Sequence, residues 1–160
     1  MDKLLKLISE NANFTSAELA AMLGEPEDAV KAKIKDYEEK GVIKGYQAIL
    51  NSDYFEDNFV EALIELKVAP KKETGFDEIA SRCMAFDEVE SVYLMAGVYD
   101  LALLVRGQTM QDIAMFVAKK LSTIEGVLST GTHFIMQRYK DRGVNLIDFE
   151  GENDERSLIL

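Results

Sequence analysis

The sequence is poor in several residue types, and each shortage limits what the protein can be. It has one cysteine, Cys83, and no tryptophan. A single cysteine excludes an intrachain disulfide, as is common in a reducing cytoplasm, and Cys83 falls on the apolar side of a predicted helix. With one histidine, His133, the chain shows no metal-ligand spacing and no nucleophile paired with a base. We therefore predict no metal, no cofactor and no catalytic site.

Long hydrophobic runs are also missing. No apolar stretch approaches the roughly 20 residues that cross a bilayer, and the start, Met1-Asp2-Lys3, lacks the pattern of an export signal. We therefore expect a cytoplasmic protein without a membrane partner. Hydrophobic residues make up 48% of the 160, which is enough for a packed core in one domain or two small ones.

Positive charge is scarce as well. The net charge is −11, whereas proteins that bind nucleic acids usually carry a basic excess. Residues 1–50 hold 7 basic and 9 acidic side chains, residues 51–140 hold 9 and 14, and residues 141–160 hold 2 and 6. The N-terminal third is thus the least acidic part, which is compatible with DNA binding but does not argue for it.

Two helices are predicted before residue 24. The first carries an apolar stripe. Thr15 and Glu18 have the spacing of a capping box, which begins a helix over 16–23 that Gly24 ends. The stripe of the first helix consists of Leu4, Leu5, Leu7, Ile8 and Ala12.

A third helix is predicted from Pro26, which suits a first turn, to Gly41. Its buried side chains, at spacings of four and three, are Val30, Ile34 and Tyr37. Two helices around a short glycine-containing turn form the helix-turn-helix pattern. Residues 42–50 should be extended and pack back onto the helices. We assign 1–50 to a DNA-binding domain and 51–58 to a linker.

In a helix-turn-helix the later helix enters the major groove. Here its first turn carries Glu27 and Asp28, which face phosphate unfavourably. A solvated helix of mixed charge is an equally good interpretation of this pattern. The candidate DNA-binding residues are Ser16, Lys31, Lys33, Lys35, Lys40 and Lys44.

Residues 59–140 predict the order β-α-β-β-α-β, the ferredoxin-like split unit with both helices on one face of an antiparallel sheet. The strands are expected at 59–68, 89–95, 99–106 and 126–139, with a tight turn at Gly97-Val98. The first helix buries Phe76, Ile79, Ala80 and Cys83, and the second begins at Thr109 and Asp112.

More apolar strand residues are present than two helices are expected to cover, so we expect dimerisation sheet to sheet. This set comprises Ile64, Leu66, Val92, Leu94, Leu101 and Leu103. The seven methionines are expected to fill the core. Residues 141–160 are expected to form an acidic tail, with an extra strand possible at 143–149.

Two places in this unit could hold a small ligand. The turn from Gly97 to Asp100 offers backbone N–H groups for a carboxylate and an acidic side chain for an ammonium group. Thr130-Gly131-Thr132 offers hydroxyls beside a glycine that permits close approach. The alternatives are that Asp100 merely favours a turn and that threonines favour strands.

Several short motifs occur in an order that resembles the Lrp/AsnC (feast/famine) transcriptional regulators. They are Gly41-Val-Ile-Lys-Gly-Tyr46, Leu50-Asn51, Gly97-Val-Tyr-Asp100, Gly126-Val127 and Thr130-Gly-Thr132, within residues 3–140. The resemblance implies an α+β protein, in which an N-terminal winged helix-turn-helix domain is followed by a ferredoxin-like βαββαβ domain of the RAM type.

The resemblance also implies partners. Members are homodimers, often assembled into octamers, that bind double-stranded promoter DNA and respond to a small-molecule effector, an amino acid, near interfaces between dimers. Carried over by position, the effector site would comprise Gly97, Tyr99, Asp100, Thr130 and Thr132, with Asp100 near the α-ammonium group.

The chain departs from the family at the recognition helix. The first 81 residues contain no arginine, the side chain that makes bidentate contacts to guanine. We expect DNA binding that is weak per dimer, salt-sensitive and rescued by avidity. One alternative is a relative that senses a small molecule or acts as an assembly partner without binding DNA. Another is an enzyme resembling sirohaem decarboxylases, for which His133 is the one histidine available.

Overall fold

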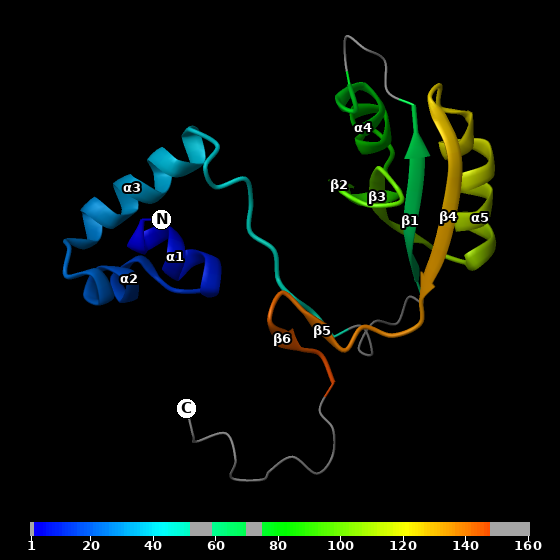
Figure 1. Ribbon diagram of the computed structural model, residues 1–160. Helices are drawn as coiled ribbons and strands as arrows, with labels where there is room; N and C mark the ends of the chain where they lie inside the picture. Colours follow the sequence, from blue (N-terminus) through cyan, green and yellow to red (C-terminus); the bar gives the residue numbers. More distant parts are fainter. Residues whose placement is uncertain (1, 52–58, 70–74, 148–160) are drawn as a thin grey trace. The chain divides into compact units, whose positions relative to one another are not determined.

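The computed structural model describes residues 2–51, 59–69 and 75–147. The chain divides into two compact units, residues 1–49 and 50–160, and each is described by itself (Figure 1). Most of the predicted linker (52–58) and the acidic end (148–160) lie outside the described residues. Within the described ranges, no helix is both long and apolar enough to cross a membrane.

The N-terminal unit consists of the three predicted helices, α1 (Lys3–Glu10), α2 (Ser16–Leu23) and α3 (Glu27–Glu39). The capping box of α2 is confirmed: the Thr15 hydroxyl accepts from the Glu18 amide, and the Glu18 carboxylate accepts from the Thr15 amide. The three helices meet in one small core. Its buried residues are Leu4, Leu19, Ala20 and Val30.

The turn between α2 and α3 follows from its glycine and its proline. Gly24 has φ +69°, the left-handed conformation that ends α2, and its amide donates to the Ala20 carbonyl. Pro26 is the N-cap of α3 and not a residue of its first turn, so the helix begins one residue later than predicted. The helix-turn-helix pattern itself is confirmed.

Residues 42–50 form no strand, but the Tyr46 hydroxyl donates to the Glu38 carboxylate of α3 at 2.9 Å, which ties this segment back to the helices as predicted. They contain no helix or strand, and Val42, Tyr46 and Leu50 are exposed. The start of the segment is held by Tyr37, whose carbonyl accepts from the amides of Val42 and Ile43. The described residues of this unit contain no strand, so the 42–50 segment has no neighbouring strand with which to pair.

The second unit is an antiparallel sheet of four strands, β1 (Val60–Val68), β2 (Val89–Leu94), β3 (Leu101–Gly107) and β4 (Val127–Ile135), in the order β2-β3-β1-β4. Helices α4 (Asp77–Met84) and α5 (Met110–Lys119) complete the predicted β-α-β-β-α-β order, and the short 3-10 helix η2 (Leu121–Thr123) follows α5. A hairpin of β5 (Lys140–Asp141) and β6 (Val144–Asn145) comes after β4.

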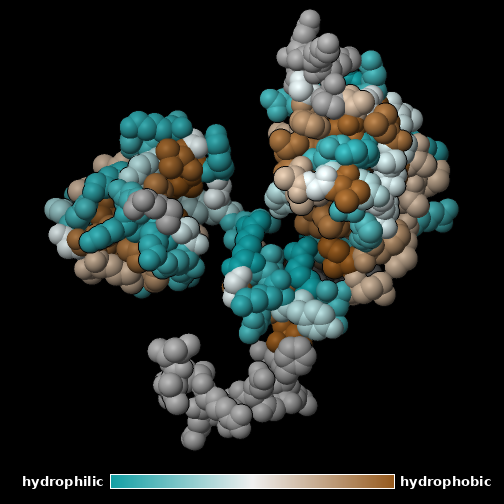
Figure 2. Space-filling view, viewed as in Figure 1, coloured by the Kyte–Doolittle hydropathy of each residue, from teal (hydrophilic) through white to brown (hydrophobic). Residues whose placement is uncertain are grey.

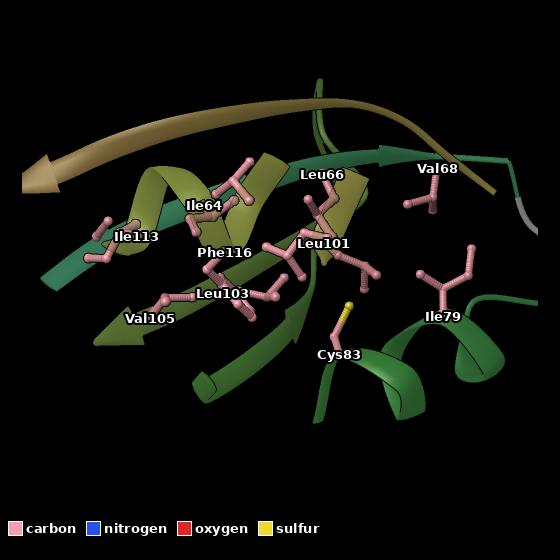
Figure 3. Close-up of a cluster of buried hydrophobic side chains, with 13 residues drawn as sticks. Ile64, Leu66, Val68, Ile79, Cys83, Leu101, Leu103, Val105, Ile113 and Phe116 are labelled. Carbon is pink, nitrogen blue, oxygen red and sulfur yellow. The ribbon is translucent and has the colours of Figure 1, made fainter. Parts of the chain in front are cut away.

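Side chains of β1 alternate between the two faces of the sheet. Ala62, Ile64, Leu66 and Val68 lie beneath the helices, where Figure 3 shows Ile79 and Cys83 of α4 and Ile113 and Phe116 of α5 closing the same core. Both helices therefore cover one face. Because Ile113 and Phe116 recur at helical spacing after the capping box of Thr109 and Asp112, α5 folds as predicted.

The expected excess of apolar strand residues is present only at Leu94. Ile64, Leu66, Leu101 and Leu103 are fully buried beneath α4 and α5, and of the expected set only Leu94 is largely exposed. The register explains this, because directly paired residues share a face and Ile64 pairs with Leu103 while Leu66 pairs with Leu101.

The face opposite the helices, which we call the open face, is mostly polar. It presents Glu61, Glu65 and Lys67 of β1, which alternate with the buried residues. Leu63 lies between them and pairs with Leu104 of β3 and His133 of β4. The open face is thus a charged surface with a small apolar centre.

The methionines do not fill the core, contrary to prediction. All six methionines of the described residues are exposed, from 40% to 84% of their surface. Figure 2 shows hydrophobic residues among hydrophilic ones on the visible surface of the sheet unit. The core is instead filled by leucine, isoleucine, valine and phenylalanine, which leaves the methionines at helix ends, in loops and on outer faces.

Candidate functional site

Helix α3 carries most of the candidate DNA-binding lysines, and each pairs with a carboxylate of its own unit. The Lys31 Nζ lies 2.8 Å from Glu27 Oε1, and the Lys40 Nζ lies 2.7 Å from Asp36 Oδ2. The hydrogen bonds to these acids raise the pKa values of both lysines. All of these groups are solvent-exposed, so the pairs contribute little to stability and can exchange partners.

The remaining lysines of α3 follow the same pattern. Lys33 Nζ donates to both carboxylate oxygens of Glu25, at 2.8 and 2.7 Å, which raises its pKa, and Lys35 lies 3.7 Å from Glu39. Lys44 lies after the helix, with its ammonium group folded over Gly41. The structure brings positive charge along α3, but with matched negative charge.

Glu27 contacts two of the candidate DNA-binding residues, a role that the sequence did not indicate. Its Oε1 accepts from the Ser16 hydroxyl at 2.7 Å and pairs with Lys31. The hydrogen bond from Lys31, followed by that from Ser16, lowers the pKa of Glu27. Two candidate DNA contacts, from the starts of α2 and α3, therefore converge on one carboxylate.

The second candidate site surrounds the segment between β2 and β3. This connection spans residues 95–100 and is longer than the tight turn predicted, closed by the Met95 amide donating to the Asp100 carbonyl at 2.8 Å. Gly97 has open space where a Cβ would lie and no positive φ, so the backbone does not require a glycine there.

Asp100 joins this segment to the end of β1. Its Oδ2 accepts from the Val68 amide at 2.9 Å and its Oδ1 from the Lys67 ammonium at 3.1 Å. The Val68 hydrogen bond, then the Lys67 one, lowers the pKa of Asp100. Lys67 is the residue that sequence reasoning missed, although its place among the alternating polar residues of β1 would have indicated it.

Tyr99 and Gly131 lie together on the sheet. A Cβ on Gly131 would stand 3.3 Å from the Tyr99 hydroxyl and 3.6 Å from His133 Nε2. The other partner of His133 is Glu65, whose Oε2 lies 3.0 Å from Nε2. The close approach expected at Gly131 is therefore present, and the group that approaches the glycine is the Tyr99 side chain of the same chain.

Thr130 and Thr132 point the other way. Their cross-strand partners are Leu66 and Ile64, both fully buried beneath the helices. The structure thus splits the predicted effector residues between the two faces of β4. Since β4 is an edge strand of the sheet, a ligand lying along that edge could still reach groups on both faces.

A third polar cluster lies at the other end of β1. Glu61, only 10% exposed, accepts from Arg106 at 3.1 Å and from Arg138 at 2.9 Å. Arg106 also pairs with Glu90 and lies over the Phe59 ring, and Arg138 reaches Asp141 of β5. This network fixes the chain after β4 against the sheet. Among the described residues, no group of three or more His, Cys, Asp and Glu could hold a metal ion.

Known proteins resemble this chain over almost all of its length. Residues 61–144 match the family described as "Lrp/AsnC ligand binding domain". The uncharacterized HTH-type transcriptional regulator YugG of Bacillus subtilis is 42% identical over 159 residues, which is 99% of this chain and 94% of that protein.

Solved structures share the fold. The leucine response regulatory protein LrpA of Mycobacterium tuberculosis has a TM-score of 0.72 at 22% identity, covering 92% of this chain and all of that one. A feast or famine regulatory protein of M. tuberculosis, solved in complex with L-methionine, has a TM-score of 0.68 at 25% identity and covers 86% and 90% of the two chains.

Proposed function

The chain belongs to the Lrp/AsnC family of HTH-type transcriptional regulators, and from that membership we propose that it binds promoter DNA through α3 and a free amino acid through its sheet unit. Its relatives are regulators and not enzymes, so the decarboxylase alternative is set aside. The observation that carries the DNA-binding half is the helix-turn-helix of α2 and α3 with lysines along α3.

DNA binding by this helix requires an exchange of partners. Lys31, Lys33, Lys35 and Lys40 must leave their carboxylates for phosphates, while Ser16 and Lys44 add contacts at the edges. The ion pairs are exposed, so the exchange costs little. The carboxylates remain near the DNA, however, and their repulsion keeps affinity low and strongly dependent on salt.

The effector site that we propose uses the 95–100 segment and the β4 edge. Asp100 would face the α-ammonium group, because a carboxylate that already accepts two hydrogen bonds still has lone pairs for a third. Exposed backbone around Gly97 and the Thr130 and Thr132 hydroxyls would meet the carboxylate, and Tyr99 would form a wall. The L-methionine complex of the M. tuberculosis protein supports an amino acid as the class of ligand.

Two copies of the chain would pair through the open face. Leu63 is half-buried at its centre, in a row with Leu104 and His133, and a second copy would cover this apolar centre while ion pairs surround it. Pairing of this kind also doubles the number of DNA-binding helices, which compensates for weak contacts per chain.

The experiment that tests this function is fluorescence-anisotropy titration of DNA from upstream of the protein's own gene, against a scrambled duplex, at low and physiological salt. We expect tighter binding to the natural duplex and a steep loss of affinity with salt. Addition of the responsive amino acid should change the affinity for DNA. The twenty L-amino acids form the panel.

The second candidate is a sensor that does not bind DNA. The specific observation in its favour is that every lysine of α3 is already matched by an acid of the same unit. Absence of selective binding at either salt, with an amino acid still binding in calorimetry, would establish this candidate and reject the DNA-binding half of the proposal.

A further inference from the structure

Helix α3 presents one outward face in the helix-turn-helix. Its opposite side packs against α1 and α2 (Figure 1) through Val30, Ile34 and Tyr37. The residues of the outward face are exposed and recur at i, i+3, i+4 and i+7, which puts them on one side of the helix. They are Asp28, Lys31, Ala32 and Lys35.

Among the described residues, Asp28 is the one acid of α3 whose carboxylate makes no hydrogen bond and no ion pair. Every other acid of this helix has a partner within the N-terminal unit. These pairs are Glu27–Lys31, Asp36–Lys40, Glu38–Tyr46 and Glu39–Lys35. The Asp28 carboxylate can therefore accept hydrogen bonds from a bound molecule without giving up a contact in the protein.

Ala32 lies one turn after Asp28 on the outward face. All of α3 lies within the described residues, and every other exposed residue of the helix is charged. Ala32 is therefore a small apolar spot in a charged surface. Its short side chain lets the helix approach a neighbouring surface closely at this point.

These two side chains match groups that bases present in the major groove, where the first turns of the later helix contact base edges. A carboxylate accepts from the N4 amino group of cytosine, whereas guanine and thymine present acceptor oxygens that repel it. Adenine has a donor at N6 but an acceptor beside it at N7. An alanine methyl group contacts the C5 methyl group of thymine.

We propose that Asp28 and Ala32 determine which bases this chain selects, Asp28 by binding a cytosine and Ala32 by contacting a thymine near it. The inference rests on the proposed DNA-binding function and adds to it the identity of the bases. Lys31 and Lys35 supply affinity for phosphates. The repulsion between Asp28 and phosphate weakens binding to every duplex, while its repulsion of the wrong bases increases selectivity.

The geometry of α3 also limits the spacing of the two bases. Four residues advance a helix by roughly 6 Å, and base pairs are about 3.4 Å apart, so the cytosine and the thymine should lie about one or two base pairs apart.

The test is selection of duplexes from a randomised library by the full-length protein, followed by sequencing, which requires no known operator. The parent should prefer a C·G pair about tenfold at one position, the size of one base contact. Asp28→Asn should keep the rest of the motif and change that position to an A·T pair, because an asparagine amide bonds to both N6 and N7 of adenine. Glu10→Gln removes the same charge from α1 and is the matched control, which should select the parent motif.

Deoxyuridine tests Ala32, because it lacks only the methyl group of thymine. In the selected duplex, deoxyuridine in place of the thymine near that cytosine should weaken binding of the parent several-fold. Ala32→Gly should bind the two duplexes equally. The comparison is made within one protein, so any loss of helix stability in Ala32→Gly cancels, as in a double-mutant cycle.

Failure of this inference and failure of the proposed function give different results. If the parent enriches no motif, it does not select DNA by sequence, and both are wrong. If the parent enriches a motif that Asp28→Asn leaves unchanged, or that Glu10→Gln changes equally, the protein still binds DNA and only this inference is overturned. A parent that binds thymine and deoxyuridine duplexes equally overturns the assignment of Ala32.

Discussion

The Asp100 carboxylate accepts the backbone amide of Val68, with Oδ2 2.9 Å from the nitrogen. In return, the Asp100 amide donates to the Leu66 carbonyl at 2.9 Å, so one residue closes the end of β1 from two sides. The position of the 95–100 segment relative to β1 therefore depends on this pair of bonds.

The Asp100 bond predicts a pH-dependent contribution to stability. Its pKa is lowered in the folded protein, so the stabilisation is complete above the ordinary aspartate value of 3.8 and disappears as pH falls through the lower, folded value. We expect Asp100→Ala to lower the free energy of unfolding near neutral pH. The difference from the parent, measured in urea at a series of pH values, should shrink in acid.

Asp87→Ala is the control for this experiment, since Asp87 is an exposed aspartate after α4. It should change stability little at any pH. If Asp100→Ala binds every responsive amino acid as tightly as the parent in calorimetry, Asp100 holds the segment without touching the effector.

Gly126 is required by its surroundings, and Gly97 is not. Gly126 has φ +95°, and a Cβ there would stand 2.8 Å from Ile79 Cδ1 and 3.1 Å from the Ala69 carbonyl oxygen. Gly126→Ala should lower the free energy of unfolding by about 2 kcal/mol, from backbone strain and crowding. Gly97→Ala should change the urea midpoint little, and equal effects of the two variants would contradict the geometry.

The Cys83 thiol should be unreactive toward thiol reagents in the folded protein. It is fully buried in the sheet core, and burial raises the pKa of its thiol to about 11. Since the thiolate is the reactive form, a disulfide-exchange reagent at pH 8 should label it at the rate of unfolding. Labelling should become immediate in denaturant, and rapid labelling of the native protein would exclude this packing.

The lysines of α3 should supply affinity without sequence discrimination. Replacing Lys31 and Lys35 together by alanine should weaken binding to the natural and scrambled duplexes alike. The slope of log affinity against log salt should fall by about 2, one for each lost phosphate contact. The matched control replaces Lys3 and Lys6 of α1, and equal losses in both double variants would show a general charge effect.

Removing the carboxylate at Glu27 should have the opposite effect. Glu27→Gln frees Lys31 and removes a negative charge from the start of α3, while the amide can still bond to Ser16. We expect tighter binding to any duplex in the same anisotropy assay. Weaker binding would mean that Glu27 positions Ser16 or Lys31 and does not compete with phosphate.

Glu61 should contribute more to stability than Glu65, although both lie on the open face of β1. Glu61 is nearly buried and holds two arginines, whereas Glu65 is more exposed and its partner is His133. Glu61→Ala should cost about 1–2 kcal/mol, as expected for the loss of hydrogen bonds to charged groups. Glu65→Ala should cost less in the same urea titration.

Much of the fold follows from local pattern. The capping box at Thr15 and the helix start at Thr109 and Asp112 are short-range signals, because each involves residues three apart, and both are present where the sequence predicted them. The 42–50 segment could not be predicted in this way, since a strand exists only where another strand pairs with it.

The site was predictable only as a set of residue types. The sequence indicated Tyr99, Asp100 and the threonines of β4, but the register with β1 decides that Thr130 and Thr132 face the helices while Tyr99 meets Gly131. Lys67 belongs to the site only because its ammonium group donates to Asp100, a residue 33 positions later in the chain.

The sequence by itself determined the order of helices and strands, the family and the charge of α3, because these depend on neighbours along the chain. The tertiary structure alone decided that Lys67 meets Asp100, that Asp100 is bound to Val68, and that Ile64, Leu66, Leu101 and Leu103 all lie beneath α4 and α5. Those outcomes depend on cross-strand register and on contacts between distant residues, and a one-residue shift in pairing would reverse every face.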